Sequence, residues 1–162
     1  MSLLLPFPDK HVAGQGKGRG LEMGEMNEKK RKILIVDDDE ELVRILSVNL
    51  SMEGFEVCAA FDGMSAVMRA HKEQPDLIVL DIRMPAGNGL SVVEKLRAST
   101  KTFAIPIMFL SALPREEVKE KAAQAGVIHY YTKPFDLDSL LNYIKGILGI
   151  KQEIPVLKVL GA

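Results

Sequence analysis

The sequence is poor in cysteine, has no tryptophan and contains no long apolar run. Cys58 is the only thiol among the 162 residues, which excludes an internal disulfide framework and a cluster of thiolate metal ligands and fits a reducing compartment. The apolar opening is interrupted by Pro6 and Pro8 and lacks the basic start of a secretory signal, and no other run reaches the roughly 18 to 20 apolar residues of a membrane span. We therefore expect a soluble protein of the cytoplasm.

The chain also lacks a large net charge of either sign. The formal net charge of −1 gives no general attraction for nucleic acid or anionic lipid, so we expect neither direct nucleic-acid binding nor a membrane partner. The basic run at residues 29–32 is interpreted as an exposed lead-in to the domain. The 47% hydrophobic fraction is sufficient for one domain of ordinary size with a well-buried core.

The chain divides into an extension, one domain and a tail. Beyond the apolar opening, residues 1–32 are rich in glycine and charge and show neither helical nor strand periodicity, which predicts a flexible N-terminal extension. Met23 and Met26 are alternative natural starts, and the residues upstream would then come from cloning or from an overlong gene prediction. The domain is predicted at residues 33–149. The C-terminal tail, residues 150–162, is too short for an output domain, so output requires a partner protein or a longer chain.

Short β-rich runs alternate with amphipathic segments throughout this domain. Five strands alternating with five helices predict an α/β three-layer sandwich with a five-stranded parallel sheet and right-handed crossovers. Ligands of such sheets bind beyond the carboxyl ends of the strands. The strands are predicted at residues 33–36, 56–60, 77–81, 105–111 and 128–132, and the helices at residues 41–53, 63–73, 89–99, 115–125 and 136–148. The first helix carries Leu42, Ile45, Leu46 and Leu50 at helical spacing.

Chemically active side chains follow four of the predicted strands. Asp37 and Asp38 follow the first strand, Asp81 ends the third, Ser111 ends the fourth and Lys133 follows the fifth. Crowded carboxylates stay ionised together when a cation lies among them, and an all-oxygen ligand set favours Mg²⁺. Such a site suits phosphoryl transfer to an aspartate, with an ammonium group and a hydroxyl group contacting the phosphoryl oxygens. No serine–histidine or cysteine–histidine pair supports acyl transfer of the triad kind.

Four motifs in this order carry a resemblance to a known family. They are "ILIVDDDEE", "LIVLDIRMP", "IMFLSA" and "YYTKPF", and together they span most of residues 32–149. The sequence resembles the receiver domain of two-component response regulators, which implies a flavodoxin-like topology. It also implies partnership with a sensor histidine kinase or phosphotransfer protein and with a downstream output protein, and it leaves homodimerisation open. The protein would not be an enzyme beyond assisting its own phosphorylation and dephosphorylation.

The resemblance also assigns roles to individual residues. Asp81 would be the phosphoacceptor, and Asp37, Asp38, Asp81 and the backbone carbonyl of Arg83 would hold Mg²⁺. Ser111 and Lys133 would contact the phosphoryl group, Ser111 and Tyr130 would form the switch, and Pro134 would follow a cis peptide bond. In the family, the residues at the positions of Arg83 and Leu113 tune the lifetime of the phosphoryl group. Neither side chain here offers an acid or an amide that could orient an attacking water. The resemblance therefore suggests a long-lived phosphoryl group.

Two other functions remain as alternatives. The Asp-x-Asp spacing after the first strand also occurs in Mg²⁺-dependent phosphatases of the haloacid dehalogenase type, although Glu41 stands where that family has threonine or valine. A docking module that works without phosphorylation is the other alternative. Asp39, Glu40 and Glu41 are interpreted as the acidic start of a helix, where they meet the positive end of its dipole, and not as metal ligands.

Overall fold

The computed structural model describes residues 28–85 and 87–151 of the chain. Its main sheet is parallel throughout, with the strand order β2-β1-β3-β6-β7. This order is that of flavodoxin-like folds, in which the chain reverses direction across the sheet at β1 and β3. The predicted fold class is therefore confirmed. The strands are β1 (Lys32–Val36), β2 (Glu56–Ala60), β3 (Leu77–Leu80), β6 (Ile107–Ser111) and β7 (His129–Thr132).

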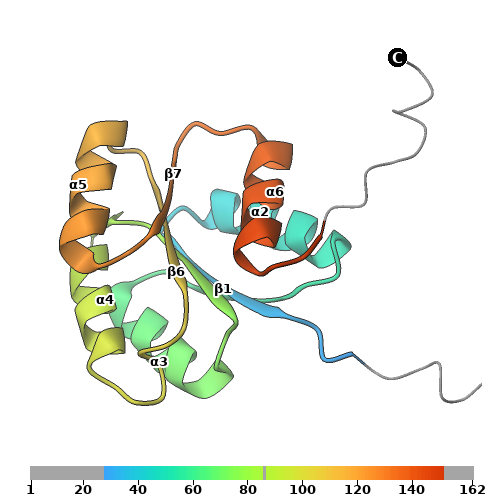
Figure 1. Cartoon of the computed structure of the whole chain (residues 1–162), viewed down its shortest axis with the longest axis horizontal. Helices are drawn as coiled ribbons and strands as arrows, with labels where there is room; N and C mark the ends of the chain where they lie inside the picture. The colour runs from blue at the N-terminus through green and yellow to red at the C-terminus, as the bar shows by residue number, and fades with distance from the viewer. Residues whose placement is uncertain (1–27, 86, 152–162) are drawn as a thin grey trace, which may run out of the picture.

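Helices cover both faces of the sheet, as Figure 1 shows. One face is covered by α2 and α6 and the other by α3, α4 and α5, and each pair of layers encloses its own apolar cluster. The strands β1, β3 and β6 are buried on both faces because helices cover them on both sides. The helices are α2 (Glu40–Met52), α3 (Gly63–Glu73), α4 (Gly89–Arg97), α5 (Arg115–Ala125) and α6 (Leu137–Ile147).

The helix ends follow from local sequence chemistry. Asp62 and Asp136 cap α3 and α6 through side chains that accept hydrogen bonds from backbone amides of the first turn. The last residues of α3 and α5 are followed by Gln74 and Gly126 in the left-handed conformation, which ends a helix cleanly. Because these signals are local, the predicted bounds of α3 and α5 agree with the structure.

Two elements were predicted too long by two residues at one end, whereas the other boundaries that differ from the structure do so by one residue. The strand predicted from residue 105 begins at Ile107, and the helix predicted to residue 99 ends at Arg97. The loop between them folds back onto the helix end, because the Arg97 guanidinium donates hydrogen bonds to the carbonyls of Phe103 and Ile105. The buried hydroxyl of Thr102 also donates to the Leu96 carbonyl, at 2.7 Å. These tertiary hydrogen bonds have no periodic signature in the sequence.

The four apolar residues that show helical spacing in α2 do not all pack on the sheet. Leu46 and Leu50 are buried, but Ile45 is 42% exposed, and Val43, which is not one of the four, is buried. Since α2 carries apolar residues around more than half of its circumference, helical spacing alone did not fix which arc packs on the sheet.

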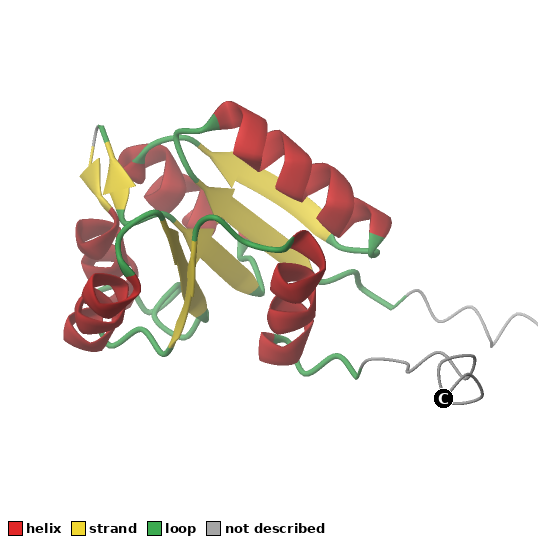
Figure 2. Ribbon diagram, turned by 90° about the horizontal axis from the view of Figure 1, so that it is seen from above, coloured by secondary structure: helices red, strands yellow, loops and turns green. Residues whose placement is uncertain are grey.

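A small antiparallel hairpin was not predicted. It pairs β4 (Arg83–Met84) with β5 (Gly87–Asn88), and Figure 2 shows it standing apart from the main sheet, beside the helices. Two-residue strands are too short to give a period-2 pattern. The hairpin directly follows the third strand, so it lies next to the site described below.

The predicted extension and tail fall mostly outside the described residues. Only residues 28–32 of the extension and 150–151 of the tail are described, and Lys32 is already the first residue of β1. The predicted domain boundaries therefore stay a prediction. Among the described residues, no helix combines the length and apolarity that crossing a membrane requires.

Candidate phosphoryl-accepting site

Three carboxylates converge at the carboxyl edge of the sheet. Asp37 and Asp38 follow β1, and Asp81 follows β3, where its amide donates a 2.9 Å hydrogen bond to the Val36 carbonyl. One oxygen of each carboxylate lies within 4.8 Å of the others. Asp37 and Asp81 are buried, whereas Asp38 is exposed. Neighbouring parallel strands thus bring together the acidic set that the sequence singled out.

The ammonium group of Lys133 completes this cluster. Its Nζ lies 2.6 Å from Asp37 Oδ2 and 3.7 Å from Asp81 Oδ2. The Lys133 amide donates to the Ser111 carbonyl at 2.9 Å, which fixes the segment after β7 against the end of β6. The peptide bond from Lys133 to Pro134 is cis, as the resemblance implied. One cation therefore faces three carboxylates, and negative charge remains in excess.

Burial and this excess of negative charge both make the Asp81 carboxyl a weaker acid. Burial raises the pKa of the Asp81 carboxyl to about 6, against the opposing effect of Lys133 and with a further upward contribution from the charge of Asp37. The Arg83 amide, 3.3 Å from Asp81 Oδ1, favours the ionised form only weakly. A divalent cation among the three carboxylates would offset both burial and repulsion. The all-oxygen donor set fits Mg²⁺, which uses few protein carboxylates and retains water ligands.

The acidic run at the end of β1 divides into two parts. Asp39 is the N-cap of α2, and its carboxylate accepts hydrogen bonds from the amides of Glu41 and Leu42. Glu40 and Glu41 lie in the first turn, where the helix dipole favours acidic side chains. The Asp39 amide also donates to Asp37 Oδ1 at 2.9 Å, which links the cap to the cluster. Asp39, Glu40 and Glu41 therefore belong to the helix start, as predicted from the sequence.

Ser111 and Tyr130 differ in where they lie relative to the carboxylate cluster. Ser111 is buried at the carboxyl end of β6, and its hydroxyl oxygen accepts a 3.3 Å hydrogen bond from the Leu113 amide. Tyr130 is half-buried in β7, where its ring packs against the cluster under α5. It also lines a cleft of about 500 Å³ with Arg115 and Phe135. Ser111 thus shares the edge with the carboxylates, whereas Tyr130 faces the neighbouring surface.

Gly89 is a positioning residue that the sequence reasoning missed. A Cβ at this position would lie 2.5 Å from the Asp81 carbonyl oxygen and 2.8 Å from Ile82 Cα, which no side chain tolerates without backbone movement. The Gly89 amide also donates to the Ile82 carbonyl at 2.8 Å. Only glycine lets α4 begin this close to the backbone of Asp81. Two glycines around Asn88 in the sequence were the signal that could have indicated a tight turn here.

The family of the chain follows from comparison with known proteins. Residues 33–145 match the profile of the response regulator receiver domain. The chain therefore belongs to the receiver domain family of two-component response regulators, and the fold and the clustered aspartates agree with that class. The family match gives no support to the haloacid dehalogenase alternative.

Two characterised relatives are bacterial transcriptional regulators. RpaA of Synechocystis, a DNA-binding dual master transcriptional regulator, is 37% identical over 124 residues, which cover 76% of this chain and 52% of RpaA. PhoP of Bacillus subtilis, the alkaline phosphatase synthesis transcriptional regulatory protein, is 40% identical over 118 residues, 73% of this chain and 48% of PhoP. The chain thus spans about half the length of these relatives.

Solved structures share the whole fold. The chemotaxis response regulator CheY4 of Vibrio cholerae is 29% identical, with a TM-score of 0.69, over 74% of this chain and 99% of CheY4. The non-phosphorylated HemR receiver domain of Leptospira biflexa is 28% identical, with a TM-score of 0.68, over 78% of this chain and all of that domain (100%). Both are similar to this chain along their entire lengths.

Proposed function

We propose that Asp81 accepts a phosphoryl group from a sensor histidine kinase or a phosphotransfer protein. Mg²⁺ would be held by Asp37, Asp38 and Asp81 with the backbone carbonyl of Arg83. The observation that carries this proposal is the convergence of three carboxylates and one ammonium group at one edge of the sheet. The family supports the phosphoacceptor role in general.

The chemistry follows from the charges of the site. A carboxylate oxygen of Asp81 attacks the phosphorus in line, and the bond from phosphorus to the donor breaks with its electron pair leaving on the donor. Bound Mg²⁺ supplies charge neutralisation at the phosphoryl oxygens. Lys133, now shared between Asp37 and Asp81, can turn to a phosphoryl oxygen, and the Ser111 hydroxyl can donate to another. The pKa of Asp81 near 6 leaves most of the nucleophile ionised at neutral pH.

Output would proceed through a change of surface. Ser111 moves toward the new dianion and Tyr130 turns inward from its half-buried position, which alters the face formed by α5, β7 and α6. A downstream output protein would bind this face. Pairing of two copies of the chain through the same face is the other form of output that the family allows. The protein works in the cytoplasm as a signalling switch and does not turn over an external substrate.

Mass spectrometry tests the assignment of Asp81. The full chain is incubated with Mg²⁺ and acetyl phosphate, and wild type is compared with Asp81→Ala and with Asp39→Asn as a nearby carboxylate control. We expect one added phosphoryl group in wild type and in Asp39→Asn, and none in Asp81→Ala. A gain that persists in Asp81→Ala refutes the assignment.

The same experiment separates the alternatives. Absence of any gain in wild type, together with failure to bind beryllofluoride in Mg²⁺, would indicate a docking module that works without phosphorylation. Steady phosphatase turnover that survives Asp81→Asn but is lost in Asp37→Asn would indicate a phosphatase.

A further inference from the structure

A groove beside the acidic cluster contains three charged side chains that are joined by ion pairs. The groove has a volume of about 550 Å³ and runs from Asp38 to α5. Ile82, Met84 and Leu113 contribute its apolar lining. Besides Asp38, the charged side chains along it are Arg83 of β4 and Glu117 and Lys121 of α5, which form two ion pairs.

The Arg83 guanidinium is held only loosely by Glu117 in this groove. Its Nη2 lies 3.9 Å from Glu117 Oε1, and Lys121 Nζ lies 3.9 Å from the same oxygen. The Arg83 side chain is 74% exposed and that of Glu117 is 40% exposed. Neither distance is short enough for a hydrogen bond, and exposed ion pairs of this kind contribute little to stability. The guanidinium can therefore leave Glu117 at small cost.

The backbone of Arg83 also contacts Asp81. The Arg83 amide lies 3.3 Å from Asp81 Oδ1, so the Arg83 side chain extends from backbone that contacts the acceptor carboxylate. A phosphoryl group on Asp81 would add a dianion with three acceptor oxygens at this point. The guanidinium binds phosphoryl oxygens more strongly than it binds a single distant carboxylate oxygen, because two donors can engage at once. Phosphorylation therefore creates a better partner for Arg83 than Glu117.

We propose that Arg83 is a second cationic contact of the phosphoryl group, which Glu117 holds away from the site until phosphorylation. This inference rests on the function proposed above. Lys133 contacts the phosphoryl group from the β7 side, and Arg83 closes over it from the β4 side. Glu117 then keeps only Lys121 as its partner, so the tie between the hairpin and the first turns of α5 is released. The charge of the site is thereby transmitted to α5 by the exchange of one ion pair.

Beryllofluoride binding in Mg²⁺ measures this exchange without requiring a kinase. Four variants of the full chain are compared with wild type: Arg83→Met, Glu117→Gln, the double variant, and Glu116→Gln as a control. Glu116 is the exposed neighbour of Glu117 in the same helical turn, so its substitution reports the general effect of removing one negative charge.

We expect Arg83→Met to weaken binding by about fivefold to tenfold, the size of one charge-assisted contact near a surface. Glu117→Gln should tighten binding by about twofold to threefold because it frees the guanidinium. In the Arg83→Met background, Glu117→Gln should have no effect beyond that of Glu116→Gln. Amide hydrogen exchange over residues 115–121 should increase on beryllofluoride binding in wild type and not in Arg83→Met.

Three results would overturn the inference. The first is unchanged affinity in Arg83→Met. The second is a Glu117→Gln effect of equal size with and without Arg83, since Glu117 would then act on the site independently. The third is an equal effect of Glu116→Gln and Glu117→Gln. If wild type itself binds no beryllofluoride, the proposed function fails as a whole, which is distinct from these three outcomes.

Discussion

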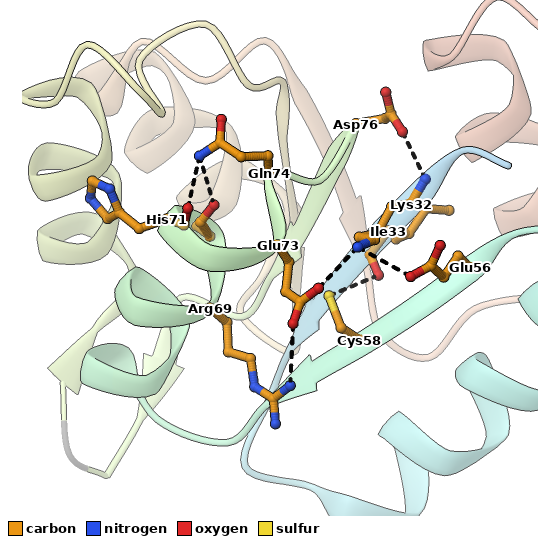
Figure 3. Close-up of polar contacts among 10 residues, drawn as sticks. Lys32, Ile33, Glu56, Cys58, Arg69, His71, Glu73, Gln74 and Asp76 are labelled. Atoms are coloured by element: carbon orange, nitrogen blue, oxygen red, sulfur yellow. Dashed lines mark hydrogen bonds and ion pairs between the residues drawn. The ribbon is translucent and has the colours of Figure 1, made fainter. Parts of the chain in front are cut away.

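The two ends of the same sheet treat charge in opposite ways. At the amino end, shown in Figure 3, Lys32 Nζ lies 2.9 Å from Glu73 and 3.1 Å from Glu56. Asp76 and Arg69 extend this network, since Asp76 Oδ2 accepts a 2.7 Å hydrogen bond from the Lys32 amide and Arg69 lies 3.9 Å from Glu73. With Arg31 beside Asp76, three cations meet three carboxylates. At the carboxyl end, three carboxylates meet the single ammonium group of Lys133.

The balance of charge decides what each end can do. Hydrogen bonding to Lys32 lowers the pKa of Glu73, so ionisation there stabilises the fold. Burial raises the pKa of Asp81 to about 6, so ionisation there opposes the fold. The amino end therefore fastens β1, β2 and α3 together, whereas the carboxyl end retains negative charge that a cation can neutralise. Within one fold, binding capacity lies where charge is left uncompensated.

The largest effect is expected where the carboxyl end depends on close backbone packing. Gly89→Ala would place a Cβ 2.5 Å from the Asp81 carbonyl oxygen, and we expect a loss of about 3 kcal/mol in the free energy of unfolding. Gly146→Ala is the matched control, because nothing lies within 4 Å of its Cβ in α6. That variant should gain about 0.5 to 1 kcal/mol. Urea denaturation measures both, and equal effects would show that Gly89 does not constrain the site.

Asp81→Asn tests the sign of the charge effect at the carboxyl end. The folded-state pKa is about 6, above the ordinary value of 3.8, so folded protein binds more protons than unfolded protein between these values. Stability therefore falls as pH rises from about 4 to 6. Without divalent cations at pH 7.5, Asp81→Asn should gain about 2 kcal/mol. The gain should vanish below pH 4 and shrink in Mg²⁺. A less stable Asp81→Asn at pH 7.5 would contradict the comparison.

The amino end should respond with the opposite sign. Lys32→Met leaves Glu56 and Glu73 without their shared cation, so we expect a lower thermal midpoint. The change should be smaller than the gain in Asp81→Asn, and Mg²⁺ should not restore it. Lys29→Met, at an exposed position before β1, serves as the control and should leave the midpoint unchanged. An unaffected Lys32→Met would mean that the network does not fasten the strands.

The smallest effect separates the two halves of the acidic run. Asp39→Ala removes the N-cap of α2 and should cost about 1 kcal/mol in unfolding free energy. Phosphorylation by acetyl phosphate should remain. Asp38→Ala should instead leave stability nearly unchanged and raise the Mg²⁺ concentration needed for phosphorylation. Loss of phosphorylation in Asp39→Ala would instead indicate that Asp39 belongs to the metal site.

The sequence predicted those parts of the molecule that depend on period and chain order. Asp37, Asp81 and Lys133 could be placed at one edge because the carboxyl ends of parallel strands must meet there. It did not predict the features that arise only in three dimensions. The exposed Ile45 depends on which arc of α2 packs, and the approach of Gly89 to Asp81 depends on the hairpin. The ion pair of Arg83 with Glu117 joins two elements whose spacing no local pattern records.

The contact between Lys133 and Asp37 joins residues 96 positions apart in the chain. This contact requires β1, β3, β6 and β7 to lie side by side in that order, because β3 and β6 separate β1 from β7 in the sheet. A partly folded or truncated chain would possess the three aspartates but lack their cation. The ammonium group of the proposed site is thus in place only when these four strands have assembled, so phosphorylation of Asp81 would report on the assembly of most of the sheet.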